Sequence, residues 1–296
     1  METNMRQADA KVNVIGIVSE VDLKLDKDDK GVEQITGTVT VKTSEFNFIP
    51  FRVWTKAKKN DGTDNKQFAG IKTVMEEYKP LARYSEEEAD KISVSGNVNP
   101  FEGRNGLTIG YRSNFFNRLR GGSDVVFEPK AEFDIEMYIK AIVPEMVKNG
   151  GDIEESGRYI MKGWMPTYNG IEPIEAIVPE DLVDDIQDLY SPGDTVNIWG
   201  DIINSRVVKD NSKAGAFGKA KKKVETTFIN ELVITGGEPP YDEENPLRYN
   251  KEVIDAAVQE RENKKEADKA NATNARSNTR PSGAARGRKL EGFLDI

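Results

Sequence analysis

The sequence around Gly96 and the sequence around Gly200 follow the same pattern, and this repeat limits what the chain can fold into. Each segment alternates apolar and polar residues and is interrupted by its glycine, which is typical of a strand that bends. The two glycines lie 104 residues apart, about the length of one small domain. The pattern therefore predicts that one β-rich unit occurs twice.

The residues before each glycine also correspond. An apolar strand is predicted at residues 49–54 and again at 174–179, and each is followed by a stretch that can form a helix, at 66–78 and 179–190. The resulting order is three strands, a helix and two strands. This is the order of a small five-stranded barrel whose helix lies between strands 3 and 4, and such barrels commonly bind single-stranded nucleic acid.

We therefore predict an all-β protein of two tandem barrels of the oligonucleotide-binding (OB) type. The segments after the barrels are polar, and the last of them is too poor in apolar residues to fold alone. The predicted boundaries are a flexible leader at 1–10, barrels at 11–122 and 130–238, a polar helical extension at 239–268, and a disordered basic tail with an acidic-apolar tip at 269–296.

Composition excludes several kinds of chemistry. The 296 residues include no cysteine and no histidine, which rules out disulfides, Cys/His zinc sites and histidine-based triads. No apolar run reaches the roughly 20 residues of a membrane helix, and residues 1–9 do not resemble a secretory signal. We expect a cytoplasmic protein, in the host cytoplasm if the chain is phage-encoded.

The charges of the chain are segregated. The net charge is −9, yet residues 205–223 hold seven Lys and Arg against one acid, and residues 263–289 hold eight against two. Basic segments of this kind favour contact with phosphate, whatever the sign of the total charge.

The first candidate site combines aromatic and basic residues of the first unit. Aromatic rings can stack on unpaired bases, and cations neutralise phosphates. Most of these rings are individually more typical of a barrel core, but Phe115 and Phe116 are adjacent in a predicted strand and cannot both face inward. The candidate residues are Phe46, Phe48, Arg52, Trp54, Lys56, Lys58, Arg104, Tyr111, Arg112, Phe115, Phe116 and Arg118.

The second candidate site is the long loop predicted between the last two strands of the second unit, residues 204–223. Loops of more than about 12–15 residues are uncommon unless they are functional or disordered. A solvated loop without function is the alternative. Its candidate residues are Arg206, Lys209, Lys213, Phe217, Lys219, Lys221, Lys222 and Lys223.

The evidence for catalysis in the sequence is weak. The acids Asp181, Asp184, Asp185 and Asp188 could hold magnesium, but their helical spacing is more typical of a solvated face. Neither a GxxxxGK[ST] phosphate loop nor a GxSxG nucleophile motif is present. We expect no enzyme activity, no cofactor and no metal.

The chain ends in a basic arm followed by a short tip that contains Phe293, Leu294, Asp295 and Ile296. With the two predicted barrels, this end resembles single-stranded DNA-binding proteins of bacteria and their phages. The resemblance implies OB barrels and a tip that binds replication or recombination proteins. A basic tail that contacts DNA directly is equally compatible with the residues.

The sequence thus favours a protein that coats and protects single-stranded DNA in the replication or recombination of a phage, with single-stranded RNA left open as a ligand. Two alternatives stay open. One is a structural or assembly protein of a virion or polymerase complex, whose β-domains and tail bind other proteins. The other is a nuclease that uses carboxylates and a metal.

Overall fold

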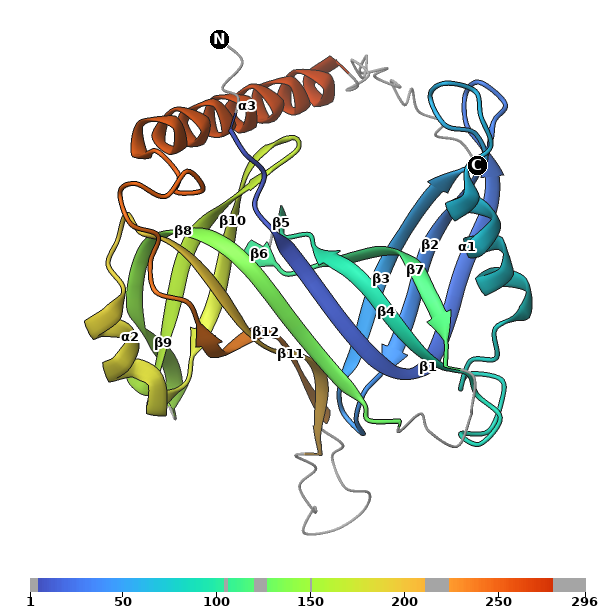
Figure 1. Ribbon diagram of the computed structural model, residues 1–296, viewed down its shortest axis with the longest axis horizontal. Helices are drawn as coiled ribbons and strands as arrows, with labels where there is room; N and C mark the ends of the chain where they lie inside the picture. The colour runs from blue at the N-terminus through green and yellow to red at the C-terminus, as the bar shows by residue number, and fades with distance from the viewer. Residues whose placement is uncertain (1–4, 104–105, 120–126, 150, 211–223, 279–296) are drawn as a thin grey trace, which may run out of the picture.

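The computed structural model describes residues 5–103, 106–119, 127–149, 151–210 and 224–278 (Figure 1). These residues form one ten-stranded sheet that closes twice on itself, and a separate two-stranded hairpin. The strands are long and alternate between buried and exposed residues, as expected when one face of a sheet packs on a core and the other meets solvent.

Barrel one has the strand order β1-β2-β3-β7-β4 and is closed by pairing of β4 with β1. A helix connects its third and fourth strands, and a short hairpin lies between its fourth and fifth. Its elements are β1 (Ala10–Lys27), β2 (Glu33–Lys42), β3 (Phe48–Lys56), α1 (Lys66–Glu77), β4 (Lys91–Val98), β5 (Phe101–Gly103), β6 (Gly106–Thr108) and β7 (Tyr111–Arg118).

Barrel two repeats this plan with the order β8-β9-β10-β12-β11, and β11 closes it by pairing with β8. A long helix follows the barrel. The elements are β8 (Lys130–Asn149), β9 (Asp152–Thr167), β10 (Gly170–Val178), η1 (Glu180–Leu182), α2 (Val183–Leu189), β11 (Thr195–Asp210), β12 (Val224–Gly237) and α3 (Lys251–Asn278). The predicted all-β fold of two tandem OB-like barrels is thereby confirmed.

The glycines of the repeat occupy the same place in the two barrels. Gly96 and Gly200 lie in the fourth strand of their barrels, β4 and β11, each beside an irregularity in the pairing with the fifth strand. A Cβ atom on Gly96 would lie 2.5 Å from the carbonyl oxygen of Arg112, and one on Gly200 would lie 1.9 Å from that of Val233. Only glycine permits these close approaches of two strands.

The two barrels share their sheet. The first half of β1 pairs with β4 on one side and with β8 on the other, over six residue pairs from Ala10↔Ile135 to Ile15↔Lys130. This pairing, here called the seam, lies in the middle of the molecule (Figure 1). One cluster of buried apolar side chains passes from one barrel into the other across it. The sequence did not predict the seam.

Helix α1 closes one end of barrel one. Asn65 caps its first turn by accepting a hydrogen bond from the backbone N–H of Gln67, and Ile71 and Val74 bury its inner face. The helix ends before Tyr78, whose hydroxyl donates a 2.7 Å hydrogen bond to the carbonyl of Phe116. Tyr78 thereby fixes the helix to strand β7.

Helix α3 packs outside barrel two. Its residues Ile254 and Ala257 are buried with Tyr138, Ile171 and Tyr249 in a second apolar cluster. Figure 1 shows the helix lying across one end of this barrel. None of the described helices is long and apolar enough to cross a membrane.

Two boundaries differ from the predictions. Helix α3 extends to Asn278, so residues 269–278 of the predicted disordered tail are helical. Residues 204–210, predicted as part of the loop, belong to β11, because the hairpin strands extend beyond the barrel.

Candidate nucleic-acid interface

The outer face of barrel one carries its exposed aromatic and basic residues together. In β3 the side chains of Phe51 and Val53 point into the barrel, so those of Arg52 and Trp54 point outward. In β7 the buried Tyr111 is followed by the exposed Arg112. Since β3 and β7 are neighbouring parallel strands, Arg52 and Arg112 occupy paired positions on this face.

Trp54 lies at the centre of this face and 47% of its surface is exposed. The guanidinium carbon of Arg112 and the ammonium nitrogen of Lys56 are each 5.7 Å from the centroid of its ring. The side-chain amide of Asn114 donates a 3.2 Å hydrogen bond to the backbone carbonyl of Trp54. A hollow of about 530 Å³ adjoins it, lined in part by Thr38, Arg52, Trp54, Asn99 and Arg112.

Hairpin β5–β6 adds a second ring. The guanidinium carbon of Arg52 lies 4.9 Å from the ring centroid of Phe101, which is half-buried at the start of β5. Phe101 could not be predicted from the sequence because its strand has only three residues, the last of them Gly103. We call Arg52, Trp54, Phe101 and Arg112 the barrel-one platform.

The cations of the platform are free to meet an anion. Arg52 and Arg112 form no ion pair with any described residue, whereas Lys56 binds Asp28 at 2.6 Å. The hydrogen bonds from the Lys56 ammonium and from the backbone N–H groups of Val32 and Lys30 hold the pKa of Asp28 below its ordinary value. This ion pair fixes the turn between β1 and β2 beside the platform.

Barrel two differs at the equivalent place. Its third and fifth strands pair through Ile177 and Val233, where barrel one has Arg52 and Arg112. Two of its nearby cations have acidic partners: Lys162 binds Glu175 at 3.4 Å, and Arg158 binds Glu145 at 2.7 Å and Glu231 at 3.0 Å. The hydrogen bonds from Arg158 lower the pKa of Glu145. This face offers little to a phosphate.

Two predicted contact residues are buried instead. The rings of Tyr111 and Phe116 are 1% and 7% exposed and pack on Phe51, with centroid distances of 6.1 and 6.0 Å. Neither can stack on a base, which corrects the prediction for them. Of the adjacent pair Phe115 and Phe116, one ring is exposed, as predicted: Phe115 is 54% exposed.

Two predicted cations have local structural roles. Arg118 forms ion pairs with Asp90 at 3.1 Å and Glu77 at 3.5 Å, and its guanidinium lies over the ring of Tyr78. Lys58 binds Asp64 at 2.6 Å. Both therefore already have acidic partners. We no longer include them in the candidate interface.

Some of the remaining predicted residues are described in the structure, and the others lie outside the described residues. Phe48 is half-buried, Phe46 is 59% exposed, and Arg206 is exposed with its guanidinium 5.7 Å from the ring centroid of Phe228. Of Lys209 only the backbone is described. The other predictions lie outside the described residues: Arg104, Lys213, Phe217, Lys219, Lys221, Lys222, Lys223, Phe293, Leu294, Asp295 and Ile296.

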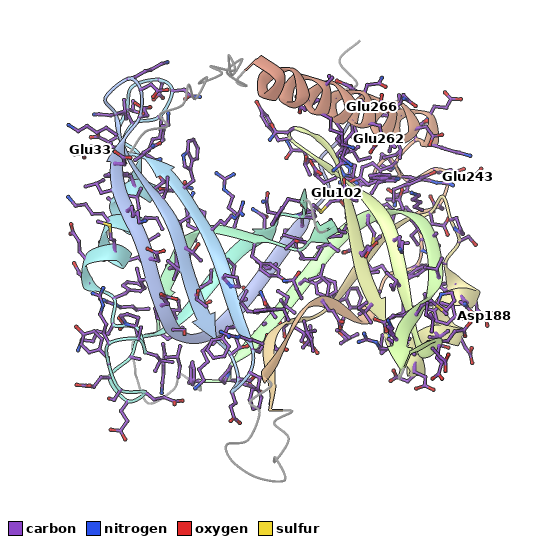
Figure 2. All side chains as sticks on the ribbon, turned by 180° about the vertical axis from the view of Figure 1, so that it is seen from behind. Glu33, Glu102, Asp188, Glu243, Glu262 and Glu266 are labelled. Atoms are coloured by element: carbon purple, nitrogen blue, oxygen red, sulfur yellow. The ribbon has the colours of Figure 1, made fainter. Side chains whose placement is uncertain are left out.

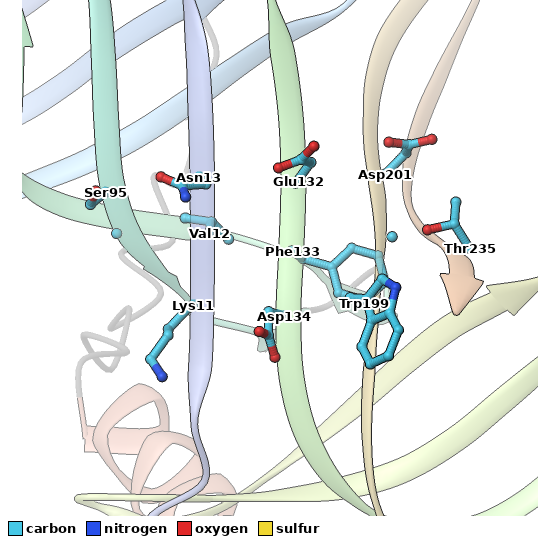
Figure 3. A pocket seen from close by; sticks show the side chains of 12 residues that line it. Lys11, Val12, Asn13, Ser95, Glu132, Phe133, Asp134, Trp199, Asp201 and Thr235 are labelled. Carbon is cyan, nitrogen blue, oxygen red and sulfur yellow. The ribbon is translucent and has the colours of Figure 1, made fainter. Parts of the chain in front are cut away.

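A groove of about 470 Å³ lies over the seam and is lined by residues of β4, β1, β8 and β11 (Figure 3). Its lining includes the ring of Trp199 and the acids Glu132, Asp134 and Asp201, which come from the neighbouring strands β8 and β11. Lys11 also lines it but is paired with Asp9 at 3.0 Å. Three carboxylates make this groove unfavourable for a nucleic-acid backbone.

Acidic clusters elsewhere do not form a metal site in the described part of the chain. Asp181, Asp184, Asp185 and Asp188 are exposed on η1 and α2, and Asp188 lies at the outer edge of barrel two (Figure 2). The described residues thus provide no constellation for the carboxylate-metal nuclease considered above.

Comparisons with known proteins were made for the whole chain. A family model described as YorF matches residues 9–271. No curated protein matches. Among solved structures, wild-type single-stranded DNA binding protein from Thermus aquaticus is similar at 10% identity and a TM-score of 0.45, over 81% of this chain and 97% of that one. A deletion mutant of the Thermus protein is similar at 11% identity and a TM-score of 0.44, over 82% and 99%.

Proposed function

We propose that this chain, which belongs to the YorF family, binds single-stranded DNA through the outer face of barrel one and catalyses no reaction. The observation that carries the proposal is the barrel-one platform. Two arginines that form no ion pair with a described residue flank an exposed tryptophan, and a second ring lies beside one of them.

The chemistry of the platform suits an unpaired strand. A base presents a flat face that can stack on Trp54, and its phosphates can approach Arg52 and Arg112. A duplex hides the faces of its bases, so it can use the arginines but not the ring. Stacking contributes about 1–3 kcal/mol per base and depends little on base identity. We therefore propose weak sequence preference and strong preference for single strands.

The position of the platform within the fold supports the same conclusion. Oligonucleotide-binding barrels use the face of strands 2 and 3 and the loops that connect strands 1–2 and 4–5. In barrel one this face carries Thr38, Arg52 and Trp54, and Phe101 lies in the connection between strands 4 and 5. Near the equivalent strand pair of barrel two, Arg158 and Lys162 are bound to acids, so we assign binding to barrel one.

In the cell we propose that the protein coats and protects single strands during DNA replication or recombination. It would do so in the cytoplasm, which is the host cytoplasm if the chain is phage-encoded.

The experiment that tests binding is a salt titration with labelled single-stranded DNA, single-stranded RNA and duplex DNA of equal length. We expect tighter binding to the single strands, and an affinity that falls as salt rises because phosphate contacts release counterions. Equal affinity for the duplex would contradict the proposal.

A protein-binding role is the second candidate, and one surface favours it. The β8–β9 hairpin exposes Met146 and Ile153 by 53% and 70% on the same side of its strands, and neighbouring exposed apolar residues are typical of protein contacts. The partner protein would belong to a virion or to a polymerase complex. If the intact protein fails to shift an oligonucleotide in a gel, this assembly role becomes the better explanation.

A further inference from the structure

A second group of exposed aromatic and basic residues lies where the two barrels meet near β11. Arg206 of β11 pairs with Phe228 of β12 in the strand register, and its guanidinium carbon is 5.7 Å from the ring centroid of Phe228. On the other side of β11, Asn47 of barrel one forms an antiparallel bridge with Ser205. Phe46 precedes Asn47 and Arg206 follows Ser205, so these two residues occupy adjacent positions.

The contact that aligns these residues is specific. The side-chain amide of Asn47 donates a 2.8 Å hydrogen bond to the carbonyl of Ile202, and its oxygen accepts a 2.7 Å hydrogen bond from the N–H of Asn204. Both lie in β11, so the turn between β2 and β3 is fixed to barrel two. The group therefore needs residues from both barrels.

The rings of this group are unusually exposed. Phe228 and Phe46 are 73% and 59% accessible to solvent, more than Trp54. Arg206 forms no ion pair with a described residue. An apolar ring held in water beside an unpaired guanidinium is the combination found in the barrel-one platform, with a flat surface for a base and a cation for a phosphate.

The two groups are connected along one strand. Phe48, Arg52 and Trp54 share the outward side of β3, and Phe46 precedes this strand. The eight residue steps from Phe46 to Trp54 span at most about 26 Å at about 3.3 Å per residue. This equals about eight nucleotides at a stacked spacing of about 3.4 Å, and fewer if the strand is stretched. One oligonucleotide could contact both groups.

We propose that Phe46, Arg206 and Phe228 form a second binding site for an unpaired nucleotide of the same DNA strand, built jointly by the two barrels. The proposal rests on the proposed function and extends it. It assigns barrel two a role in binding through its β11–β12 hairpin rather than through its closed barrel face. The sequence continues from this hairpin into six lysines between residues 207 and 223, in keeping with an approach of phosphates.

The test uses the full-length protein and oligothymidines of about four and about 16 nucleotides, which bracket the strand lengths that single OB barrels bind. The variants are Phe228→Ala, Phe46→Ala and Phe228→Trp, and Trp54→Ala serves as the reference for the barrel-one platform. Tyr168→Ala is the matched control, because Tyr168 is 86% exposed but lies on the β9–β10 hairpin. A 16-mer with photoreactive 5-iodouracil, followed by mass spectrometry, locates the contact.

We expect Phe228→Ala to weaken binding of the long oligonucleotide about tenfold, Phe228→Trp to restore it, and cross-links to form at Phe46 or Phe228. The affinity of the short oligonucleotide should change less, since Trp54 still binds it. The inference is overturned if Phe228→Ala and Phe46→Ala bind the 16-mer like the wild type while Trp54→Ala binds weakly. It is also overturned if Phe228→Ala abolishes only a self-association seen by sedimentation. If the wild type binds no oligonucleotide, the proposed function itself fails.

Discussion

Arg261 and Glu102 form a 2.8 Å ion pair that joins helix α3 to hairpin β5–β6 of barrel one. The same arginine binds Glu172 of β10 at 2.8 Å, and its side chain is only 13% exposed. Figure 2 shows Glu102 beneath α3, beside Glu262. Hydrogen bonds from Lys265 and Arg261 lower the pKa of Glu102 despite its partial burial. This network fixes the hairpin that carries Phe101.

Replacing Arg261 with methionine should therefore release hairpin β5–β6. Three acids, Glu102, Glu172 and Glu262, lose a charged partner, and we expect the free energy of unfolding in urea to fall by about 1.5–3 kcal/mol. Arg248→Met is the control, because Arg248 reaches the exposed Glu243 only at 3.9 Å and should change stability by less than about 0.5 kcal/mol. Equal losses in the two variants would show that the network does not stabilise the fold.

Trp54→Ala should weaken binding of single-stranded DNA without unfolding the protein. Loss of one stacked base costs about 1–3 kcal/mol, which is about a 5- to 150-fold loss of affinity. The ring is half exposed, so the melting temperature should barely change. Fluorescence anisotropy with a labelled oligothymidine measures the affinity. A folded variant that binds like the wild type would remove Trp54 from the interface.

Arg52→Gln and Arg112→Gln should each reduce the salt dependence of binding. Each arginine that neutralises a phosphate contributes about 0.9 to the slope of log affinity against log salt for a duplex and about 0.7 for single strands. Lysine at either position should retain the slope. Lys162→Gln in barrel two is the matched control, because Lys162 already pairs with Glu175. A slope that is unchanged in both arginine variants would contradict phosphate contact at the platform.

Gly96→Ala should destabilise barrel one. Its Cβ would lie 2.5 Å from the carbonyl oxygen of Arg112, so β4 and β7 must separate, and we expect a loss of about 1–3 kcal/mol in the free energy of unfolding. Gly70→Ala is the contrasting control: Gly70 lies in α1 with open space around it, and alanine there should stabilise the helix by about 0.5–1 kcal/mol. Opposite signs in urea unfolding are the expected result.

Glu136 provides a pH-dependent prediction. It is buried, which raises its pKa, but hydrogen bonds from Arg6, the N–H of Asp9 and the hydroxyl of Tyr241 outweigh burial, and its pKa is lowered. A lowered pKa stabilises the fold above the unfolded value of about 4.3, and this contribution disappears as pH falls through the folded value.

Glu136→Gln should accordingly cost about 1.5–3 kcal/mol at neutral pH, because Arg6 loses its charged partner. The difference in unfolding free energy between wild type and variant should shrink as pH falls from the unfolded value of about 4.3 through the lowered pKa of the folded carboxyl. Urea unfolding at several pH values measures both free energies. A difference that stays constant down to pH 3 would contradict the assigned role of the carboxylate.

Local periodicity was sufficient to predict much of the fold. The apolar residues at 49–54 predicted strand β3, and the spacing of apolar residues at 66–78 located α1. The repeat of Gly96 and Gly200 identified the two units because the same close approach recurs in both barrels. These features depend on residues near in sequence or on a duplicated constraint.

Other features depend on contacts that periodicity does not encode. Ser113 donates a hydrogen bond to the carbonyl of Ser95 and accepts one from the N–H of Phe115, at an irregularity in the pairing of β7 with β4. At this bulge two residues of β7, Ser113 and Asn114, face the single residue Gly96 of β4. The extra residue in β7 reverses which side chains point inward, so Phe115 points outward and Phe116 inward. Phe101 reaches Arg52 from a hairpin that Arg261 of α3 holds in place, and the seam depends on residues more than 100 positions apart.

The seam has a consequence for how the protein behaves on dilution. Two separate barrels that paired through the same strand edges would form a dimer, and the dimer would dissociate as the protein concentration fell. Here the β1–β8 pairing is within one chain. The fraction of molecules with these strands paired is therefore set by the effective concentration that the connecting chain imposes, and not by the protein concentration. The arrangement of the two barrels should therefore be the same at nanomolar as at micromolar protein. A fragment containing one barrel would instead expose an unpaired strand edge, which favours aggregation.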